Sequence, residues 1–181
     1  MDMHQVGFTL AEAAVTLCVL GCVVALAAPA AHDAVQEARL RAVTGDLLQH
    51  LVLARSEAIK RNARVVLCHS ADGIACSDAG GWQQGWILFH DANRNGVRDP
   101  QEAILQRINP LAPDLRLSAN GPVERYVSYD ALGTTRMASG AFQAGTFTLC
   151  RASPDAGEAR QIVVSAGGRP RVQKIRVESC L

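Results

Sequence analysis

An uninterrupted apolar run near the N-terminus constrains this chain more than any other feature. The run extends from Phe8 to about Ala31, and Glu12 is the only charged residue inside it. A helix of about 24 residues is roughly 36 Å long, which is enough to cross the hydrocarbon core of a bilayer. A signal peptide has a shorter apolar core with a small-residue cleavage site after it, whereas Gly7 precedes this run. The run therefore predicts a membrane helix, and a carboxylate inside such a helix usually has a function.

The segment Gly7-Phe8-Thr9-Leu10-Ala11-Glu12 resembles the N-terminus of type IV pilins and of the pseudopilins of type II secretion. The resemblance implies that prepilin peptidase cleaves between Gly7 and Phe8 and that the new N-terminal Phe8 is methylated. It also implies that Glu12 pairs with the N-terminus of a neighbouring pilin during assembly. An ordinary single-pass anchor with an incidental glutamate is the alternative interpretation.

Two further features of the N-terminal region bear on this resemblance. Pro29 stands where many pilins carry a helix-bending proline, and a kink is expected there because proline lacks the backbone N–H and clashes with the preceding turn. Residues 1–6 contain no lysine or arginine, although a positive flank normally holds the N-terminus of a membrane segment in the cytoplasm. We therefore expect a translational start upstream of Met1.

The chain divides into four segments on these grounds: a leader peptide (1–7), a transmembrane half of a long helix (8–31), an amphipathic half (32–62) and a β-rich globular domain (63–181). Past Pro29 the apolar residues recur at steps of three and four and predict a helix to about Arg61. This apolar stripe comprises Val35, Ala38, Val43, Leu47, Leu51, Ala54 and Ala58.

The remainder of the chain predicts short antiparallel strands and no second helix. The expected strands are 63–69, 82–89, 103–108, 114–118, 123–129, 134–137, 145–151, 161–165 and 171–177. The expected fold class is α+β and pilin-like, with the long N-terminal helix packed on a C-terminal antiparallel β domain.

The six cysteines form three pairs by position. Cys18 and Cys22 lie in the membrane run and are interpreted as small packing residues. In an oxidising periplasm Cys68 would bond Cys76, and Cys150 would bond Cys180. Zinc is the alternative, although a Cys-x7-Cys spacing suits it poorly.

The most distinctive globular segment is residues 81–99, which begins Gly-Trp-Gln-Gln-Gly-Trp and ends in a turn rich in Asp, Asn and Gly. This segment resembles the FimT/GspH branch of minor pilins and pseudopilins. The same turn matches the spacing of a calcium loop. The candidate oxygen ligands are Asp91, Asn93, Asn95, Asp99 and Glu102, with Gly96 at the turn. A plain Asn-Gly turn whose side chains cap their own backbone is the alternative.

The C-terminal arm is the second candidate site. FimT proteins that bind DNA in natural transformation carry a Gly-Arg-x-Arg element in the C-terminal tail, and Gly168-Arg169-Pro170-Arg171 matches it residue by residue. Arginine suits phosphate oxygens because its guanidinium presents a planar fork of donors. Arg160, Lys174 and Arg176 are candidate helpers, and a hairpin turn with solvated arginines is the alternative.

Composition narrows the function classes. A net charge of +1 indicates no global attraction to polyanions, and 4% aromatic residues argue against a stacking platform for single strands. His69, Ser70, Asp72 and His90 are catalytic residue types without a nucleophile motif, so we expect no enzyme and no required cofactor.

The resulting hypothesis is a minor type IV pilin, processed by prepilin peptidase and anchored in the inner membrane with its globular domain in the periplasm. It assembles with other pilins and minor pilins into a pilus and binds double-stranded DNA without sequence preference. The alternative is a GspH-like pseudopilin with a structural, protein-binding role and no DNA contact.

Overall fold

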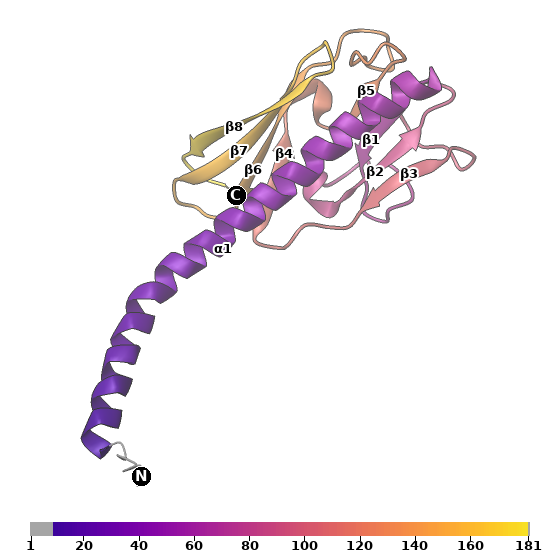
Figure 1. Ribbon diagram of the computed structural model, residues 1–181. Helices are drawn as coiled ribbons and strands as arrows, with labels where there is room; N and C mark the ends of the chain where they lie inside the picture. The colour runs from indigo at the N-terminus through magenta and orange to yellow at the C-terminus, as the bar shows by residue number, and fades with distance from the viewer. Residues whose placement is uncertain (1–8, 181) are drawn as a thin grey trace. The chain divides into compact units, whose positions relative to one another are not determined.

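The computed structural model describes residues 9–180 and contains one long helix followed by two antiparallel sheets (Figure 1). Helix α1 spans Leu10–Arg61, so the prediction of a helix ending near Arg61 is confirmed. The helical assignment continues through Pro29. Two compact units divide the chain between Arg39 and Leu40. The predicted cleavage site, Gly7 and Phe8, lies outside the described residues.

The first unit contains the one segment of the described chain, Leu10–Ala28, that is long and apolar enough to cross a membrane. Its mean hydropathy is 2.3, and its large side chains, such as Leu10 and Leu26, are exposed. The length and composition of this segment agree with the membrane anchoring that the sequence predicts.

The helix begins with a capping box, a feature that sequence reasoning missed although its Thr-x-x-Glu pattern is readable. The Thr9 backbone N–H and hydroxyl both donate to Glu12 Oε2 at 3.0 Å, and the Glu12 N–H donates back to Thr9 Oγ1 at 3.3 Å. Within this chain the Glu12 carboxylate therefore accepts the hydrogen bonds of Thr9 at the start of its own helix.

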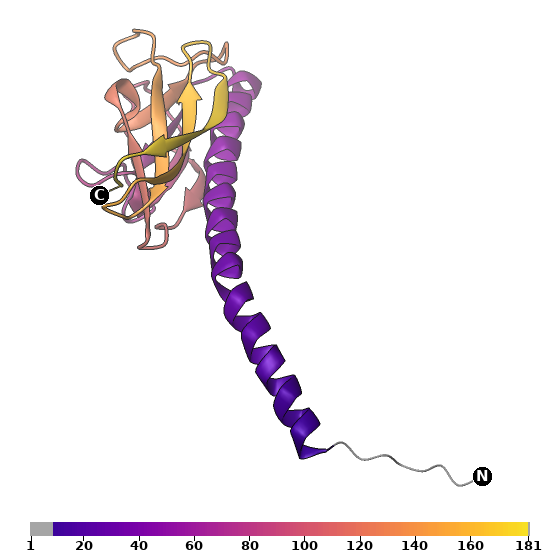
Figure 2. The ribbon, with the colours of Figure 1, turned by 90° about the vertical axis from the view of Figure 1, so that its left-hand side faces the viewer.

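The second unit is built on the rest of α1, which lies along the two sheets (Figure 2). Four residues of the predicted apolar stripe, Leu47, Leu51, Ala54 and Ala58, are buried at 1% exposure or less. They pack in the main core with residues of both sheets, including Leu67, Leu88, Phe147 and Ile162.

The helix ends at a turn that sends the chain directly into the first sheet. Asn62 adopts the left-handed conformation, with φ at 51°. The Ala63 N–H donates to the Ala58 carbonyl, and the Asn62 N–H donates to the Ile59 carbonyl. This pair of bonds is a Schellman motif, in which asparagine is one of the few residues other than glycine that tolerates the required φ. It places Arg64 just past the helix end.

The first sheet has the order β3-β2-β1-β5 and the second the order β4-β6-β7-β8, and every pairing is antiparallel. The first sheet consists of β1 (Val65–His69), β2 (Trp86–His90), β3 (Ile104–Ile108) and β5 (Tyr126–Tyr129). The second consists of β4 (Leu115–Ala119), β6 (Gly145–Arg151), β7 (Gly157–Val164) and β8 (Pro170–Val177).

The structure corrects three expected strands. Residues Trp82–Gln84 form a 3-10 turn (η1), so the strand expected at 82–89 starts only at Trp86. The left-handed Gly85 separates the two, and a Cβ there would lie 2.3 Å from the Ile108 carbonyl oxygen. Gly121–Val123 is likewise a 3-10 turn (η2), and β5 begins at Tyr126. Thr135 and Arg136 form isolated bridges rather than a strand over 134–137.

Both predicted disulfides are present. Cys68 bonds Cys76 and Cys150 bonds Cys180, with Cα–Cα distances of 5.6 and 6.1 Å. Among the described residues the free cysteines are Cys18 and Cys22, both in the apolar segment. The globular unit therefore uses its cysteines as cross-links, and the zinc alternative for these two pairs is not supported.

Candidate nucleic-acid interface

The Gly168-Arg169-Pro170-Arg171 element lies at the turn between β7 and β8. The Val164–Pro170 pair closes this hairpin, and Arg169 and Arg171 are both exposed. Arg171 is in register with Val163. The structure thus presents both arginines to solvent, one on each side of Pro170.

The hairpin tip is anchored to a neighbouring turn. The Thr135 N–H donates to the Ala166 carbonyl at 3.1 Å, and the Thr135 hydroxyl donates to the Ser165 carbonyl at 2.9 Å. Gly168 is buried with φ at 75°, and a Cβ on it would stand 1.9 Å from the Gly133 carbonyl oxygen. Glycine is required here for two reasons, the left-handed backbone and the close approach of another backbone.

The other candidate residues of the arm are placed less favourably. Register pairs Arg160 with Lys174 and Glu158 with Arg176. Because side chains alternate along a strand, Lys174 and Arg176 lie on the opposite sheet face from Arg171. Lys174 Nζ also pairs with Glu158 Oε1 at 2.6 Å. Arg169 and Arg171 therefore remain the stronger pair, and Lys174 has a carboxylate partner.

A second group of arginines lines a pocket of about 270 Å³ beside this tip. Sequence reasoning missed the group because its members come from three separate segments. Arg64 follows the helix end, Arg94 belongs to the loop after β2, and Arg136 belongs to the turn after β5. Asp130 is the one carboxylate among the lining residues, so three guanidiniums face one acid and leave a net of two positive charges.

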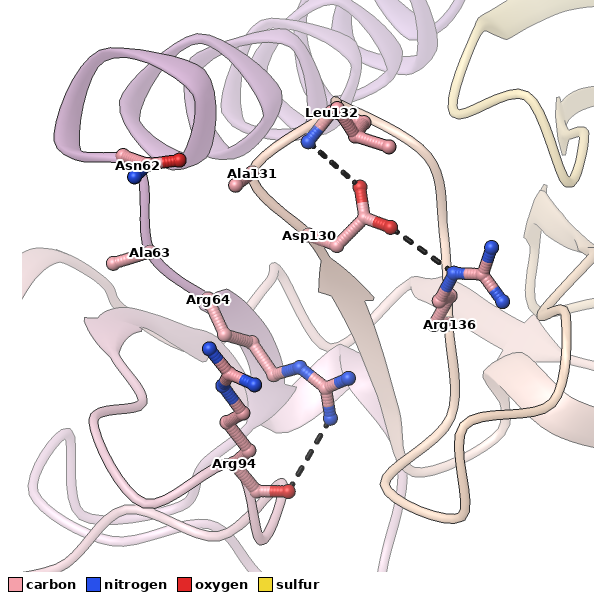
Figure 3. A pocket seen from close by; sticks show the side chains of 8 residues that line it. All are labelled: Asn62, Ala63, Arg64, Arg94, Asp130, Ala131, Leu132 and Arg136. Carbon is pink, nitrogen blue, oxygen red and sulfur yellow. Dashed lines mark hydrogen bonds and ion pairs between the residues drawn. The ribbon is translucent and has the colours of Figure 1, made fainter.

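The Asp130 carboxylate accepts hydrogen bonds from its own turn and forms an ion pair with Arg136 (Figure 3). Its carboxylate accepts the Leu132 and Thr134 N–H groups at 3.0 and 2.9 Å, the Thr134 hydroxyl at 2.6 Å and Arg136 Nε at 3.1 Å. Although burial alone would raise it, these hydrogen bonds hold the pKa of Asp130 below its usual value. Asp130 is therefore ionised at neutral pH, and it neutralises Arg136.

The loop of residues 91–102 holds the predicted calcium ligands, and its carboxylates cap backbone amides. Asp91 accepts the Asn95 and Gly96 N–H groups at 3.1 and 3.0 Å. Glu102 accepts the Ala92 and Asp99 N–H groups at 2.7 and 3.0 Å. In residues 9–180 no group of three or more His, Cys, Asp or Glu side chains is arranged to hold a metal ion. The self-capped turn is thus the arrangement that the structure contains.

Two side-chain amides complete this loop. Asn93 Nδ2 and Asn95 Nδ2 both donate to Asp99 Oδ2, at 2.6 and 3.0 Å. Burial, together with the charge of Glu102, raises the pKa of Asp91 above its usual value. A bound cation would relieve this repulsion between two buried acids, so calcium remains a prediction of the spacing.

Calcium titration tests that prediction. At millimolar calcium, the range of extracellular sites, we expect binding heat and a higher midpoint of thermal unfolding, and Asp99→Asn should weaken both. Magnesium at the same concentration serves as the control for ionic strength. A chain that shows neither heat nor thermal shift contradicts a calcium site and leaves the self-capped turn as the loop's whole role.

Three of the four residues of catalytic type, His69, Ser70 and Asp72, make structural contacts at the end of β1. The Ser70 hydroxyl donates to the Ala75 carbonyl at 2.6 Å, and Asp72 accepts the Ile74 and Ala75 N–H groups. His69 is buried at the end of β1, 6.0 Å from the Trp82 ring and edge-on to it. These contacts close the loop between Cys68 and Cys76.

Comparison with known proteins completes the description. The family model described as type II transport protein GspH matches residues 43–168. No protein of curated function matches the chain.

Three solved structures are similar. The type IV minor pilin FimU of Pseudomonas aeruginosa is 20% identical with a TM-score of 0.57, over 81% of this chain and 98% of that chain. A second crystal form of FimU is 21% identical with a TM-score of 0.56, over 78% and 100%. The minor pseudopilin EpsH of the Vibrio cholerae type 2 secretion system is 14% identical with a TM-score of 0.49, over 75% and 96%. The FimU structures have the same pilin fold as this chain.

Proposed function

The chain belongs to the GspH family of type II transport proteins, and from this premise we propose that it is a minor pilin that contacts double-stranded DNA through Arg169 and Arg171. Prepilin peptidase cleaves it between Gly7 and Phe8, Phe8 is methylated, and Glu12 pairs with a neighbouring subunit in a pilus. The globular unit is periplasmic before assembly. Cleavage and assembly in this order require a membrane-anchored precursor, and the apolar segment Leu10–Ala28 supports it.

One observation carries the DNA-binding part of the proposal. The two arginines stand on a hairpin tip that Gly168 and Thr135 fix to the body of the domain. Because the backbone of the tip is fixed, binding has to order the two arginine side chains but not the loop that carries them. Contacts to phosphates position a duplex and read no sequence. The expected binding is therefore non-specific and in the micromolar range or weaker, and several subunits in one fibre would raise it by avidity.

A second candidate function rests on where the family match ends. The match stops at Gly168, one residue before Arg169, so membership in the family does not include the two arginines. A GspH-like pseudopilin of a secretion system, which binds other pseudopilins and no DNA, needs neither of them. The two functions therefore differ in a single property that can be measured.

The test is binding of a fluorescent 20-base-pair duplex to the full chain in nanodiscs of zwitterionic lipid, followed by fluorescence anisotropy. Each phosphate contact contributes a salt slope of about 0.9, so removing two contacts at 0.1 M salt lowers affinity roughly 60-fold. We expect that loss in Arg169→Ala with Arg171→Ala.

The matched control is Arg107→Ala with Arg151→Ala, which removes the same charge elsewhere. Gly145, at one end of β6, pairs with Val164 beside the tip, and Arg151 is at the other end of the same strand. Six strand residues span about 20 Å, so Arg151 lies far from the tip. This control should bind like the wild type. Equal loss in both variants contradicts DNA contact by the tip, and no binding by the wild type at low salt favours the pseudopilin function.

A further inference from the structure

The pocket lined by Arg64, Arg94 and Arg136 has one carboxylate among its lining residues, Asp130, for three guanidiniums. Arg136 is paired with Asp130 and stacks on the Phe142 ring at 4.5 Å. No ion pair within 4.0 Å joins Arg64 or Arg94 to a carboxylate anywhere in residues 9–180. The Asp130 carboxylate points toward Leu132 and Arg136 and away from the other two arginines (Figure 3).

Arg64 and Arg94 both line this pocket, and hydrogen bonds hold the side chain of Arg64 (Figure 3). Arg64 Nη1 donates to the Arg94 carbonyl at 3.2 Å and to the Met137 carbonyl at 3.4 Å, which fixes its side chain along one wall of the pocket. The Arg64 charge also favours the ionised form of the buried Asp91, the residue that follows the end of β2, and so opposes the effect of burial on the pKa of Asp91. The Arg94 guanidinium has no hydrogen-bond partner or ion-pair partner in the part of the chain that the structure describes.

Arg94 is one of two non-glycine residues in residues 9–180 with a positive φ, at 65°. Such a backbone is uncommon outside glycine, asparagine and aspartate, and the other instance, Asn62, belongs to the helix end. The hydrogen bonds of Asp91 and Glu102 to the loop amides impose this conformation on the loop. The capped loop therefore carries a charged, exposed arginine on a backbone that is fixed next to Arg64 (Figure 3).

The pocket and the arginine tip share one structural element. Four residues of one turn line the pocket, namely Asp130, Ala131, Leu132 and Arg136, and the same turn receives the tip through Gly133 and Thr135. Because this single turn joins the tip to the pocket, one duplex can contact both.

We propose that the Arg64–Arg94 pocket binds a phosphate of the same DNA backbone that Arg169 and Arg171 contact, as a second anchor of the interface. Two guanidiniums present paired N–H donors to the oxygens of one phosphate, which is the charge-assisted geometry that arginine favours. The proposal rests on the proposed function and adds the pocket to it. With the pocket occupied, the duplex contacts the domain at two points instead of one.

Arg94→Gln is the informative variant, because the Arg94 side chain makes no contact that the fold needs. In the anisotropy assay it should lower duplex affinity about eightfold at 0.1 M salt and reduce the salt slope by about 1. Arg94→Lys keeps the charge and loses the paired N–H donors of the guanidinium, so its duplex affinity should lie between those of Arg94→Gln and the wild type. Arg107→Gln is the matched control and should bind like the wild type. Tryptophan fluorescence in urea should give the same unfolding midpoint for all four chains.

The outcomes separate this proposal from the proposed function. If Arg94→Gln binds DNA like wild type while Arg169→Ala with Arg171→Ala loses affinity, the tip binds DNA and the pocket proposal is overturned. If Arg94→Gln alone loses affinity, the pocket holds phosphate and the tip does not. If a glutamate-rich peptide is bound by wild type and not by Arg94→Gln, with duplex affinity unchanged, the pocket serves a protein carboxylate and the phosphate proposal is overturned.

Discussion

Replacing Cys150 and Cys180 with alanine is expected to lower the free energy of unfolding by about 3–4 kcal/mol. The bond spans 30 residues in sequence, and in the chain-entropy model a cross-link stabilises by restricting the unfolded chain, more strongly for a longer loop. The pair also packs with Ala159, Ile175 and Val177 in a small cluster that β8 needs. Its removal therefore takes away both the restriction on the unfolded chain and this local packing.

Urea unfolding of the full chain in detergent micelles measures this effect, with Trp82 and Trp86 as buried reporters. The comparison variant removes Cys68 and Cys76, which are only 8 residues apart, and the same model gives about 2–3 kcal/mol. Unfolding of reduced wild type should match the combined variants. If loss of the longer cross-link costs less than 1 kcal/mol, the oxidised pair is not a main source of stability.

Substitution of Gly168 by alanine is expected to cost about 2–4 kcal/mol of unfolding free energy and to displace the arginine tip. A left-handed backbone costs alanine about 1 kcal/mol, and overpacking costs a further 1–3 kcal/mol. The added Cβ would meet the Gly133 carbonyl oxygen at 1.9 Å and the Tyr129 ring at 3.2 Å. Backbone cannot yield as a flexible side chain can, so the hairpin must move.

Two other glycines supply controls for this variant. Gly140 has φ at 87° with nothing within 4 Å of an added Cβ, so Gly140→Ala should show the backbone cost alone, about 1 kcal/mol. Gly167 has no left-handed φ and meets only Ser165 Oγ at 3.9 Å, so Gly167→Ala should change stability by less than about 0.5 kcal/mol. If Gly168→Ala and Gly140→Ala unfold at the same urea concentration, the close approach to Gly133 carries no cost.

Local patterns were sufficient to predict the elements that dominate this fold. The stripe from Leu47 to Ala58 has strict helical spacing, and its burial confirms the prediction because a single face of one helix covers the sheets. The cysteine pairs were predictable from compartment and position. Trp82 was misassigned because aromatic residues favour strands, whereas its indole N–H donates to the Glu124 carbonyl at 2.8 Å from a 3-10 turn.

Only one of the two parts of the candidate DNA interface, the arginine tip, could be predicted from the sequence. The Gly-Arg-x-Arg element is contiguous, so a short motif reveals it. The pairing of Lys174 with Glu158 depends on the β7–β8 register, which the hairpin fixes and local sequence does not. Arg64, Arg94 and Arg136 are 30 and 42 residues apart in sequence, and only the packing of three loops at one end of the sheets brings them together.

The order of the second sheet leaves β8 paired on one side only, to β7. A bare strand edge invites another molecule to add its own strand, and proteins prevent this with proline and charge. This strand begins with Pro170 and carries Arg171, Lys174 and Arg176. When many copies lie close together, their positively charged edge strands repel one another, which disfavours an intermolecular β-sheet.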